Sequence, residues 1–388
     1  MPIINRVAAL ADEITLWRRD QHENPELQYD VQRTAGIVAE KLKAFGCDEV
    51  VSAIGKTGVV GVNHGRRRQS GRVIGLRADM DALPIEEDTG LPHASKVKGK
   101  MHACGHDGHT AMLLGAAKYL AETRNFDGTA VVVFQPAEEG GAGGKAMVDD
   151  GLMTRWNIQE IYGMHNAPGL PVGHFATRKG AQLAAADVFS IRVEGKGGHA
   201  AEPHKGVDTL VAAANVLLAL QSIVARNLDP MKAGVVTVGT FRGGTTANII
   251  PQTAELIGTV RSLAPDVRDL LERRVREVAT GIAAAYGATA RVDYARSYPI
   301  TTNHPRETDF AVKIASDVAG AARVIGEAPP ILAAEDFAFM LEARPGNMIF
   351  IGNGSTAALH HPAYDFNDAA IPHGVSYWAR LVEIGMPA

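Results

Sequence analysis

The chain has 388 residues, of which 46% are hydrophobic and 21% are charged, and this length favours two domains. Its net charge of −4 offers no basic surface for a nucleic-acid partner, and its two cysteines exclude a disulfide framework and an all-cysteine zinc site. The N-terminus does not resemble a secretion signal, and no apolar run approaches the roughly 20 residues needed to cross a bilayer, so we expect a cytoplasmic protein with no membrane partner.

Helical and strand-like patterns alternate through the first part of the chain and return at its end. Apolar residues at helical spacing predict an opening helix, and short β-rich runs predict strands separated by helices. This alternation favours an α/β fold with a parallel, doubly wound sheet. The predicted helices cover 7–17, 35–45 and 110–123, and the predicted strands cover 72–76, 129–134, 158–163 and 347–351.

The middle of the chain follows a different order, β-α-β-β-α-β, which is that of a ferredoxin-like unit. We therefore expect a second, α+β domain over 185–296, inserted between the two parts of the first domain, 1–184 and 297–388. Its predicted strands cover 187–194, 234–241, 253–262 and 290–294, and its predicted helices cover 208–226 and 265–285.

Side chains that bind metals gather in four segments, each directly after a predicted strand or on a glycine-rich loop. In open α/β sheets, ligands bind beyond the carboxyl ends of the strands, so charged groups there indicate a site. The segments are Leu76–Pro84 with Asp79 and Asp81, Met101–Thr110 with His102, Cys104, His106, Asp107 and His109, Phe134–Gly141 with Glu138 and Glu139, and two histidine sites at His165 and His360-His361.

The segment Met101–Thr110 is the most informative, because thiolate, imidazole and carboxylate are the usual ligands of a divalent transition metal. The other segments also allow structural roles. The aspartates after residue 76 could form a turn, and adjacent glutamates could begin a helix. Adjacent carboxylates repel each other, however, so Glu138 and Glu139 both stay ionised only with a cation nearby or with one pKa raised.

Taken together, the motifs resemble those of the M20 metallopeptidase family, and more narrowly its amidohydrolase branch, which includes hippurate hydrolases and N-acyl-amino-acid amidohydrolases. They follow the family order over nearly the whole chain, and the pair HACGHDGH and PAEEGG is specific. The motifs are RRDQHENPEL from residue 18, RADMDALP from 77, HACGHDGH from 102, QPAEEGG from 135, GGHAAEPH from 197 and LHHPAYDFND from 359.

The resemblance implies a zinc-peptidase-like catalytic domain interrupted by a lid or dimerisation domain. It also implies a metal-dependent hydrolase that cleaves the amide bond of small N-acyl amino acids, of the hippurate or N-acetyl type, by metal-activated water. Two divalent ions (Mn, Zn, Co or Ni) would bind in each subunit of a homodimer or homotetramer. Their implied ligands are Cys104, His106, Glu139, His165 and His360, with His361 as the rival of His360 and Cys104 as the bridge.

Roles beyond metal binding are implied by the same motifs. Glu138 matches the general base and Asp81 the carboxylate that supports the metal site. His199 matches a residue that reaches the active site from the partner subunit and donates to the oxyanion. Asn248 and Arg261 match positions that hold substrate, and a guanidinium suits the capture of a carboxylate.

Three alternatives remain open at this point. Cys104 beside His102 and His106 could act as a thiol nucleophile in a cysteine amidase. The chain could be a dipeptidase or aminoacylase of the same fold, or a binding protein that has lost catalysis. A surplus of ligand-type residues in four segments argues against the first of these. An intact Glu138 among intact ligands argues against the last.

Overall fold

A computed structural model describes residues 3–388 and divides them into two compact units. Unit 1 comprises residues 3–182, 302–329 and 336–388, and unit 2 comprises Leu183–Thr301 and Pro330–Glu335. The expected limits of the inserted segment, 185 and 296, lie close to these borders. The short segment 330–335 was not expected in unit 2.

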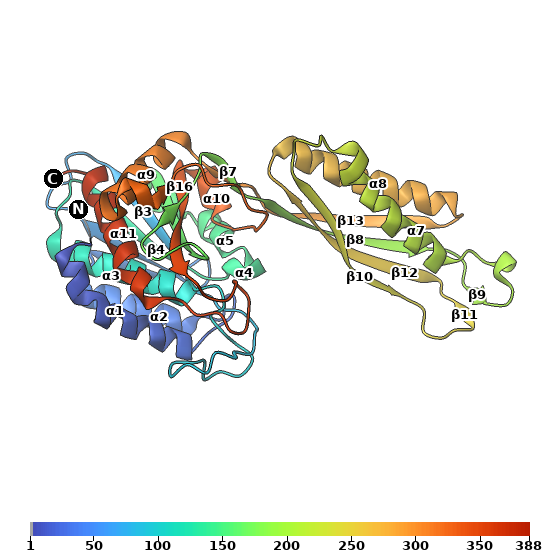
Figure 1. The fold of residues 1–388 in the computed structure, drawn as a ribbon, viewed down its shortest axis with the longest axis horizontal. Helices are drawn as coiled ribbons and strands as arrows, with labels where there is room; N and C mark the ends of the chain where they lie inside the picture. Colours follow the sequence, from blue (N-terminus) through green and yellow to red (C-terminus); the bar gives the residue numbers. More distant parts are fainter. Residues whose placement is uncertain (1–2) are drawn as a thin grey trace. The chain divides into compact units, whose positions relative to one another are not determined.

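Unit 1 is built on an eight-stranded sheet with the order β1-β2-β4-β3-β5-β16-β6-β15 (Figure 1). The four central strands are parallel, but β1 and β2 pair antiparallel with each other, β2 with β4, and β6 with β16, while β15 pairs parallel with β6. The expected parallel sheet is therefore wrong, and the sheet is mixed. The α/β class is confirmed. The strands are β1 (Glu49–Ile54), β2 (Gly58–His64), β3 (Val73–Asp79), β4 (Thr129–Gln135), β5 (Glu160–Pro168), β6 (Phe175–Ala176), β15 (Val324–Ile325) and β16 (Gly346–Gly354).

Helices cover both sides of this sheet. Helices α3 and α11 pack together on one side with α1, while α5 and α10 pack against each other on the opposite side (Figure 1). The helices of unit 1 are α1 (Asn5–Glu23), α2 (Gln32–Phe45), α3 (His106–Thr123), α4 (Glu138–Gly141), α5 (Gly143–Asp149), α6 (Leu152–Arg155), α9 (Pro305–Ala319), α10 (Ala338–Ala343) and α11 (Ile371–Gly385), with short 3-10 turns at Ala321–Arg323 and Asp368–Ala370.

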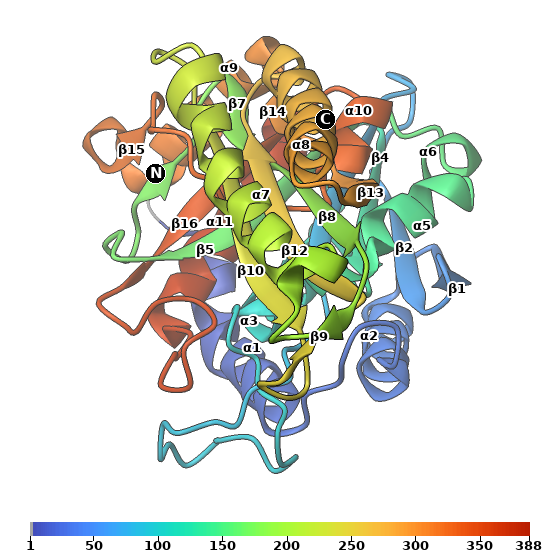
Figure 2. The same cartoon turned by 90° about the vertical axis from the view of Figure 1, so that its right-hand side faces the viewer.

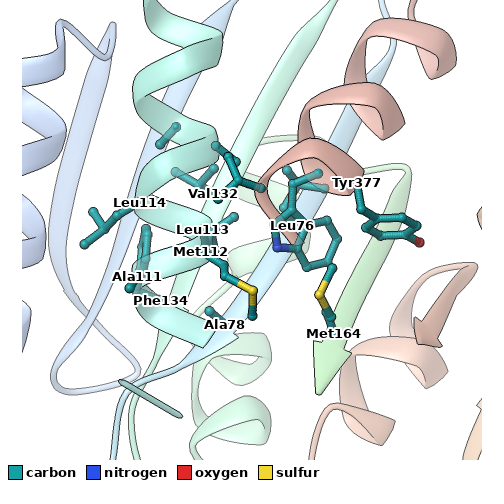
Figure 3. Close-up of a cluster of buried hydrophobic side chains, with 14 of the residues drawn as sticks. Leu76, Ala78, Ala111, Met112, Leu113, Leu114, Val132, Phe134, Met164 and Tyr377 are labelled. Atoms are coloured by element: carbon teal, nitrogen blue, oxygen red, sulfur yellow. The ribbon is translucent and has the colours of Figure 1, made fainter. Parts of the chain in front are cut away.

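The core of unit 1 lies between the central strands and α3 and α11 (Figure 3). Leu76 of β3 and Val132 of β4 are fully buried beneath Met112 and Leu113 of α3, and Tyr377 of α11 closes the far side. Burying one such aliphatic side chain stabilises the fold by about 1.5–3 kcal/mol. This packing fixes the strand ends, and with them the segments that carry the polar side chains.

Unit 2 has the strand order β10-β12-β8-β13, all antiparallel, with α7 and α8 on one face (Figure 2). This is the predicted β-α-β-β-α-β unit, with a small additional pair, β9 and β11. Strands β7 (Gly180–Leu183) and β14 (Thr301–Asn303) pair where the chain leaves and re-enters unit 1. The elements are β8 (Ala185–Glu194), β9 (Gly198–His199), a 3-10 turn (Pro203–Lys205), α7 (Thr209–Ser222) with a π turn (Ile223–Asn227), β10 (Gly234–Gly243), β11 (Ile249–Ile250), β12 (Thr253–Ser262), α8 (Pro265–Ala285) and β13 (Thr289–Tyr298).

One helix corrects the expectation about apolar runs. Thr209–Asn227 spans 19 residues with a mean hydropathy of 1.6, which is long and apolar enough to cross a membrane by length and composition alone. Its inner residues Ala212, Val216 and Leu220 are instead buried in the core of unit 2. In all, 33% of the apolar window is buried, whereas Val211 and Leu218 on the same helix are exposed.

Candidate metal centre

The predicted site residues of unit 1 meet at one edge of its sheet. Strands β4, β3 and β5 are parallel neighbours, so the segments after β3 and β4 and the carboxyl half of β5 lie side by side. Helix α3 begins at His106, four residues earlier than the predicted 110, because the HACGHDGH motif itself forms its first turn. Asp81, His106, Glu138 and His165 are brought together in this way, and all four are buried.

Two groups of ligand atoms share a single side chain. Cys104, His106 and His165 form one group, and Cys104, Glu139 and His360 form the other, with the ligand atoms of each group within 4.8 Å of one another. The two groups contain all five residues that the sequence proposes as ligands. Cys104 is the only member of both. A side chain that reaches two metal positions is what a bridging ligand requires.

The imidazole rings are oriented by backbone carbonyl groups. His106 donates its Nδ1 hydrogen to the carbonyl oxygen of Asp81 at 2.8 Å, and His165 donates its Nδ1 hydrogen to that of Asn166 at 2.7 Å. In the neutral form of each ring, Nε2 then carries the lone pair, as in most metal sites with histidine ligands. His165 Nε2 lies 3.4 Å from the sulfur of Cys104, and His106 Nε2 is buried without a hydrogen-bond partner among residues 3–388.

The structure separates the two C-terminal histidines. His360 has the left-handed backbone angle φ 64°, and its N–H donates to the carbonyl oxygen of Ala103 at 2.8 Å, which holds it beside Cys104. Its Nε2 lies 3.2 Å from Oε1 of Glu139. The ring of His361 instead accepts the N–H of Ala363 at 3.0 Å. Of the pair, only His360 is in the cluster.

A tight turn presents Glu138 and Glu139. Both oxygens of Asp81 accept backbone N–H groups from it, that of Glu138 at 2.9 Å and that of Glu139 at 3.1 Å. Ala137, just before the turn, has φ 53°, a left-handed conformation that is unfavourable for alanine. Asp81 thus holds the backbone of both glutamates.

The donor set fits divalent metal ions. Cys104, Glu138 and Glu139 bring three acidic groups close to the ligand nitrogens, and Nε2 of His106 is buried without a hydrogen-bond partner among residues 3–388. Burial raises the pKa of the Cys104 thiol, and burial together with His109 lowers the pKa of His165. A bound cation would reverse the first effect by stabilising the thiolate, and neutral His165 is already in the form that binds metal.

Behind the ligands lies a hydrogen-bond network that the sequence analysis did not identify. His109 donates from Nδ1 to Asp79 at 2.6 Å and accepts the Asn166 N–H on Nε2 at 2.9 Å, so neither nitrogen is left for a metal. The side-chain amide of Asn166 donates to the carbonyl of Cys104 at 2.6 Å and accepts from the Tyr364 hydroxyl at 2.8 Å. The sequence signal that could have identified Asn166 is its position directly after the proposed ligand His165 in a strand.

The three predicted residues of unit 2 fall into two places within it. His199 on β9 pairs with Ile249 on β11, and the carbonyl of Asn248 accepts the Ala200 N–H at 3.1 Å, so His199 and Asn248 are neighbours. Arg261 is the ninth residue of β12, which begins at Thr253 after β11. At about 3.3 Å per residue, Arg261 lies roughly 26 Å along β12 from Thr253.

Comparisons with known proteins agree on one family. The model of peptidase family M20/M25/M40 matches residues 75–384. Hippurate hydrolase of Campylobacter jejuni is 43% identical over 98% of both chains, and N-acetyl-L-cysteine deacetylase of Bacillus subtilis is 41% identical over 91% of this chain and 83% of its own. The crystal structure of a Bacillus subtilis protein, described as a dinuclear metal-binding peptidase of the M20 family, superposes with a TM-score of 0.85 at 35% identity, covering 98% of this chain and 99% of its own.

Proposed function

The chain belongs to peptidase family M20/M25/M40 and is a metal-dependent amidohydrolase, and we propose that it releases free amino acids from N-acyl amino acids at the cluster around Cys104. The names of two relatives, hippurate hydrolase and N-acetyl-L-cysteine deacetylase, both denote N-acyl amino acids as substrates. The observation that carries the proposal is the pair of ligand groups that share Cys104, with Glu138 beside them.

Two divalent ions would be held by Cys104, His106, Glu139, His165 and His360, with Cys104 between them. Thiolate, imidazole and carboxylate donors suit Zn, Mn, Co or Ni better than Ca or Mg. When bound, such ions polarise the acyl carbonyl group and lower the pKa of a water molecule. The other steps depend on side chains of the chain itself.

Glu138 is the proposed general base. Its carboxylate lies within 4.8 Å of ligand atoms of His106 and Glu139 but belongs to neither group that contains Cys104. It takes a proton from the attacking water and returns one to the nitrogen of the leaving amine as the C–N bond breaks. Its backbone is held by Asp81, so the carboxylate is placed before substrate binds.

His199, Asn248 and Arg261 complete the proposed site only if two subunits contribute. An N-acyl amino acid such as hippurate is far shorter than the roughly 26 Å along β12 from Thr253, which follows β11 in the chain, to Arg261. The three residues can contact one substrate if Arg261 comes from one subunit and His199 and Asn248 come from the other. We therefore propose a homodimer as the smallest active form, and a homotetramer would contain two such pairs.

The Arg261 side chain is suited to bind a carboxylate group of the substrate. Its guanidinium donates to the Val260 carbonyl at 3.0 Å and to the Thr259 hydroxyl, and it makes no ion pair within residues 3–388. It is half-buried, which would strengthen an ion pair with the α-carboxylate of a substrate. We assign it to the amino-acid end of the substrate, while His199 donates to the carbonyl oxygen that gains charge.

The cysteine-amidase alternative is disfavoured by the surroundings of Cys104. Burial raises the pKa of its thiol, so without a cation the group stays a weakly nucleophilic thiol. Its sulfur is fully buried among ligand atoms. We also propose a cytoplasmic location, since the HACGHDGH cysteine must stay reduced to bind metal.

Hydrolysis of a substrate panel tests the proposal. Free amino acid is measured after incubation with N-benzoylglycine, N-acetyl amino acids, indoleacetyl amino acids and an unblocked dipeptide. We expect release from N-acyl substrates, loss after dialysis against a chelator, and recovery with Mn²⁺, Zn²⁺, Co²⁺ or Ni²⁺. Activity that survives chelation and is abolished by thiol alkylation would contradict the metal mechanism. Hydrolysis of the dipeptide alone would assign the chain to the dipeptidases.

A further inference from the structure

We propose that Asp336 is a positioning residue that holds the turn carrying Glu138 in its catalytic position. The inference rests on the proposed function of Glu138 as general base. Asp336 belongs to none of the motifs that identified the site, and it lies almost 200 residues from Glu138 in the sequence. Its side chain is fully buried in unit 1.

The Asp336 carboxylate joins the two ends of the catalytic turn. Its Oδ1 accepts the side-chain N–H of Gln135 at 2.7 Å, and its Oδ2 accepts the backbone N–H of Gly144 at 2.7 Å. Gln135 is the last residue of β4, and Gly144 is the second residue of α5. Residues 136–143, with both glutamates, therefore lie between two points fixed to one carboxylate.

This turn needs such an anchor because its backbone is strained. Ala137 and Ala142 have φ values of 53° and 54°, and each left-handed alanine costs on the order of 1 kcal/mol. A conformation of this kind persists only when the surrounding contacts fix it. Asp81 fixes the middle of the turn through the N–H groups of Glu138 and Glu139, and Asp336 fixes both ends.

Asp336 also contacts the base directly. Its backbone N–H donates to Oε1 of Glu138 at 3.4 Å, and carboxylate oxygens of the two residues lie within 4.8 Å. Arg77 balances the charge, because its guanidinium contacts Asp336 at 3.2 Å and Asp79 at 2.8 Å and is fully buried. Glu138 is thus held by an N–H donor while the neighbouring negative charge is neutralised by an arginine.

The arrangement requires a carboxylate rather than an amide. Gln135, Gly144 and Arg77 all donate hydrogen bonds to Asp336, and together they use both of its oxygens. Asparagine has one oxygen, so Asp336→Asn would set an N–H₂ group against a donor at one end of the turn. That end would be released, and Glu138 would lose its position relative to the ligands.

Steady-state kinetics, metal content and thermal stability of Asp336→Asn test the proposal with N-benzoylglycine as substrate. We expect kcat to fall about 10- to 100-fold, as small displacements of a catalytic group do, while KM and the number of bound metal ions stay as in the wild type. Glu160→Gln is the matched control. Glu160 is also buried and accepts from two arginines, but it begins β5, five residues before His165. This control should lower the melting temperature without lowering kcat.

Several results would overturn the proposal. One is an Asp336→Asn enzyme with wild-type kcat, another is a loss of activity no greater than that of Glu160→Gln, and a third is a loss explained by missing metal. If Asp336→Asn does not fold, Gln135→Met removes the hydrogen bond to Oδ1 of Asp336, together with the acceptor of the Arg77 Nε–H, and must lower kcat at constant KM. An unchanged kcat in that variant overturns the proposal too. Failure of the proposed function would give a different result, because Glu138→Gln would then retain activity.

Discussion

Cys104 is the one side chain that the two ligand groups have in common, so its removal should have a larger effect than the removal of any other ligand. Each protein is incubated with excess metal, and the unbound metal is then removed by gel filtration. We expect about two ions per chain in the wild type, about one in His165→Ala and almost none in Cys104→Ala. Metal analysis of the purified proteins measures this.

Cys47 provides the control for that comparison. It is half-buried, belongs to no group of possible ligands within residues 3–388, and has a pKa raised by burial to about 11, so it stays a thiol. Cys47→Ala should keep both ions. Two ions in Cys104→Ala would show that the sulfur does not bridge.

His22 makes stability depend on pH. Its buried ring lies 2.8 Å from Asp107 and 3.4 Å from Glu87, and although burial lowers its pKa, these carboxylates raise it to about 9. A folded-state pKa above the unfolded value of 6.5 contributes stability that is complete below pH 6.5 and is lost as the pH rises through 9.

Urea unfolding of the metal-loaded wild type and of His22→Gln measures this contribution. We expect the difference in the free energy of unfolding to shrink by on the order of 3 kcal/mol between pH 6 and pH 9.5. A difference that is the same at both values would show that His22 is not charged in the folded protein.

The residues of the site differ in how far the sequence reveals them. Cys104, His106 and Glu139 stand in dense motifs, where several ligand types at short spacing make a structural explanation for each one improbable. Asp336 and Tyr364 could not be assigned, because their partners are distant in sequence and a single aspartate or tyrosine has many ordinary roles. Choosing between His360 and His361 needed the backbone, since only the left-handed turn decides which ring faces Glu139.

At the scale of elements, the turn between β4 and α5 is the segment least tolerant of substitution. A Cβ atom on Gly143 would lie 1.7 Å from the carbonyl oxygen of Pro136, which is backbone and cannot move aside alone. Gly143→Ala should therefore displace the turn, lower the melting temperature and reduce kcat/KM at least about 10-fold.

Gly36→Ala is the control, because Gly36 lies exposed within α2 and a Cβ there would meet nothing within 4 Å. Alanine should stabilise that helix by about 0.5–1 kcal/mol and leave activity unchanged. Wild-type activity and stability in Gly143→Ala would contradict the geometry of the turn.

Elements with a strong hydrophobic periodicity could be predicted from the sequence, and elements defined by pairing between strands could not. The limits of α8 and β12 agree with their sequence patterns, because each has an apolar face against the core of unit 2. Strands β1 and β2 were missed, and their antiparallel pairing makes the sheet mixed. Strand direction depends on contacts with β4, some 70 residues away, and leaves no local mark in the sequence.

For the whole molecule, the central question is whether the catalytic constellation is completed across subunits. Chains with Glu138→Gln and chains with His199→Ala should each be inactive alone. In a mixed dimer, one site combines the intact Glu138 of the second chain with the intact His199 of the first. Co-expression of equal amounts should therefore restore about one quarter of wild-type activity.

Complementation fails if both residues act within one chain, because every site in the mixture then carries one lesion. Mixing two preparations that share the Glu138→Gln lesion controls for recovery unrelated to subunit exchange. Activity of that control mixture above the level of its components would invalidate the comparison.

The most direct test of the account concerns Glu138 alone. We predict that Glu138→Gln keeps about two metal ions per chain and the wild-type melting temperature, since Glu138 is in neither ligand group that contains Cys104 and its backbone N–H still binds Asp81. We also predict that hydrolysis of N-benzoylglycine falls at least about 100-fold, because Glu139, the other carboxylate of the turn, is proposed as a metal ligand and would not be free to accept the proton. A Glu138→Gln enzyme that hydrolyses N-benzoylglycine at the wild-type rate would contradict the account.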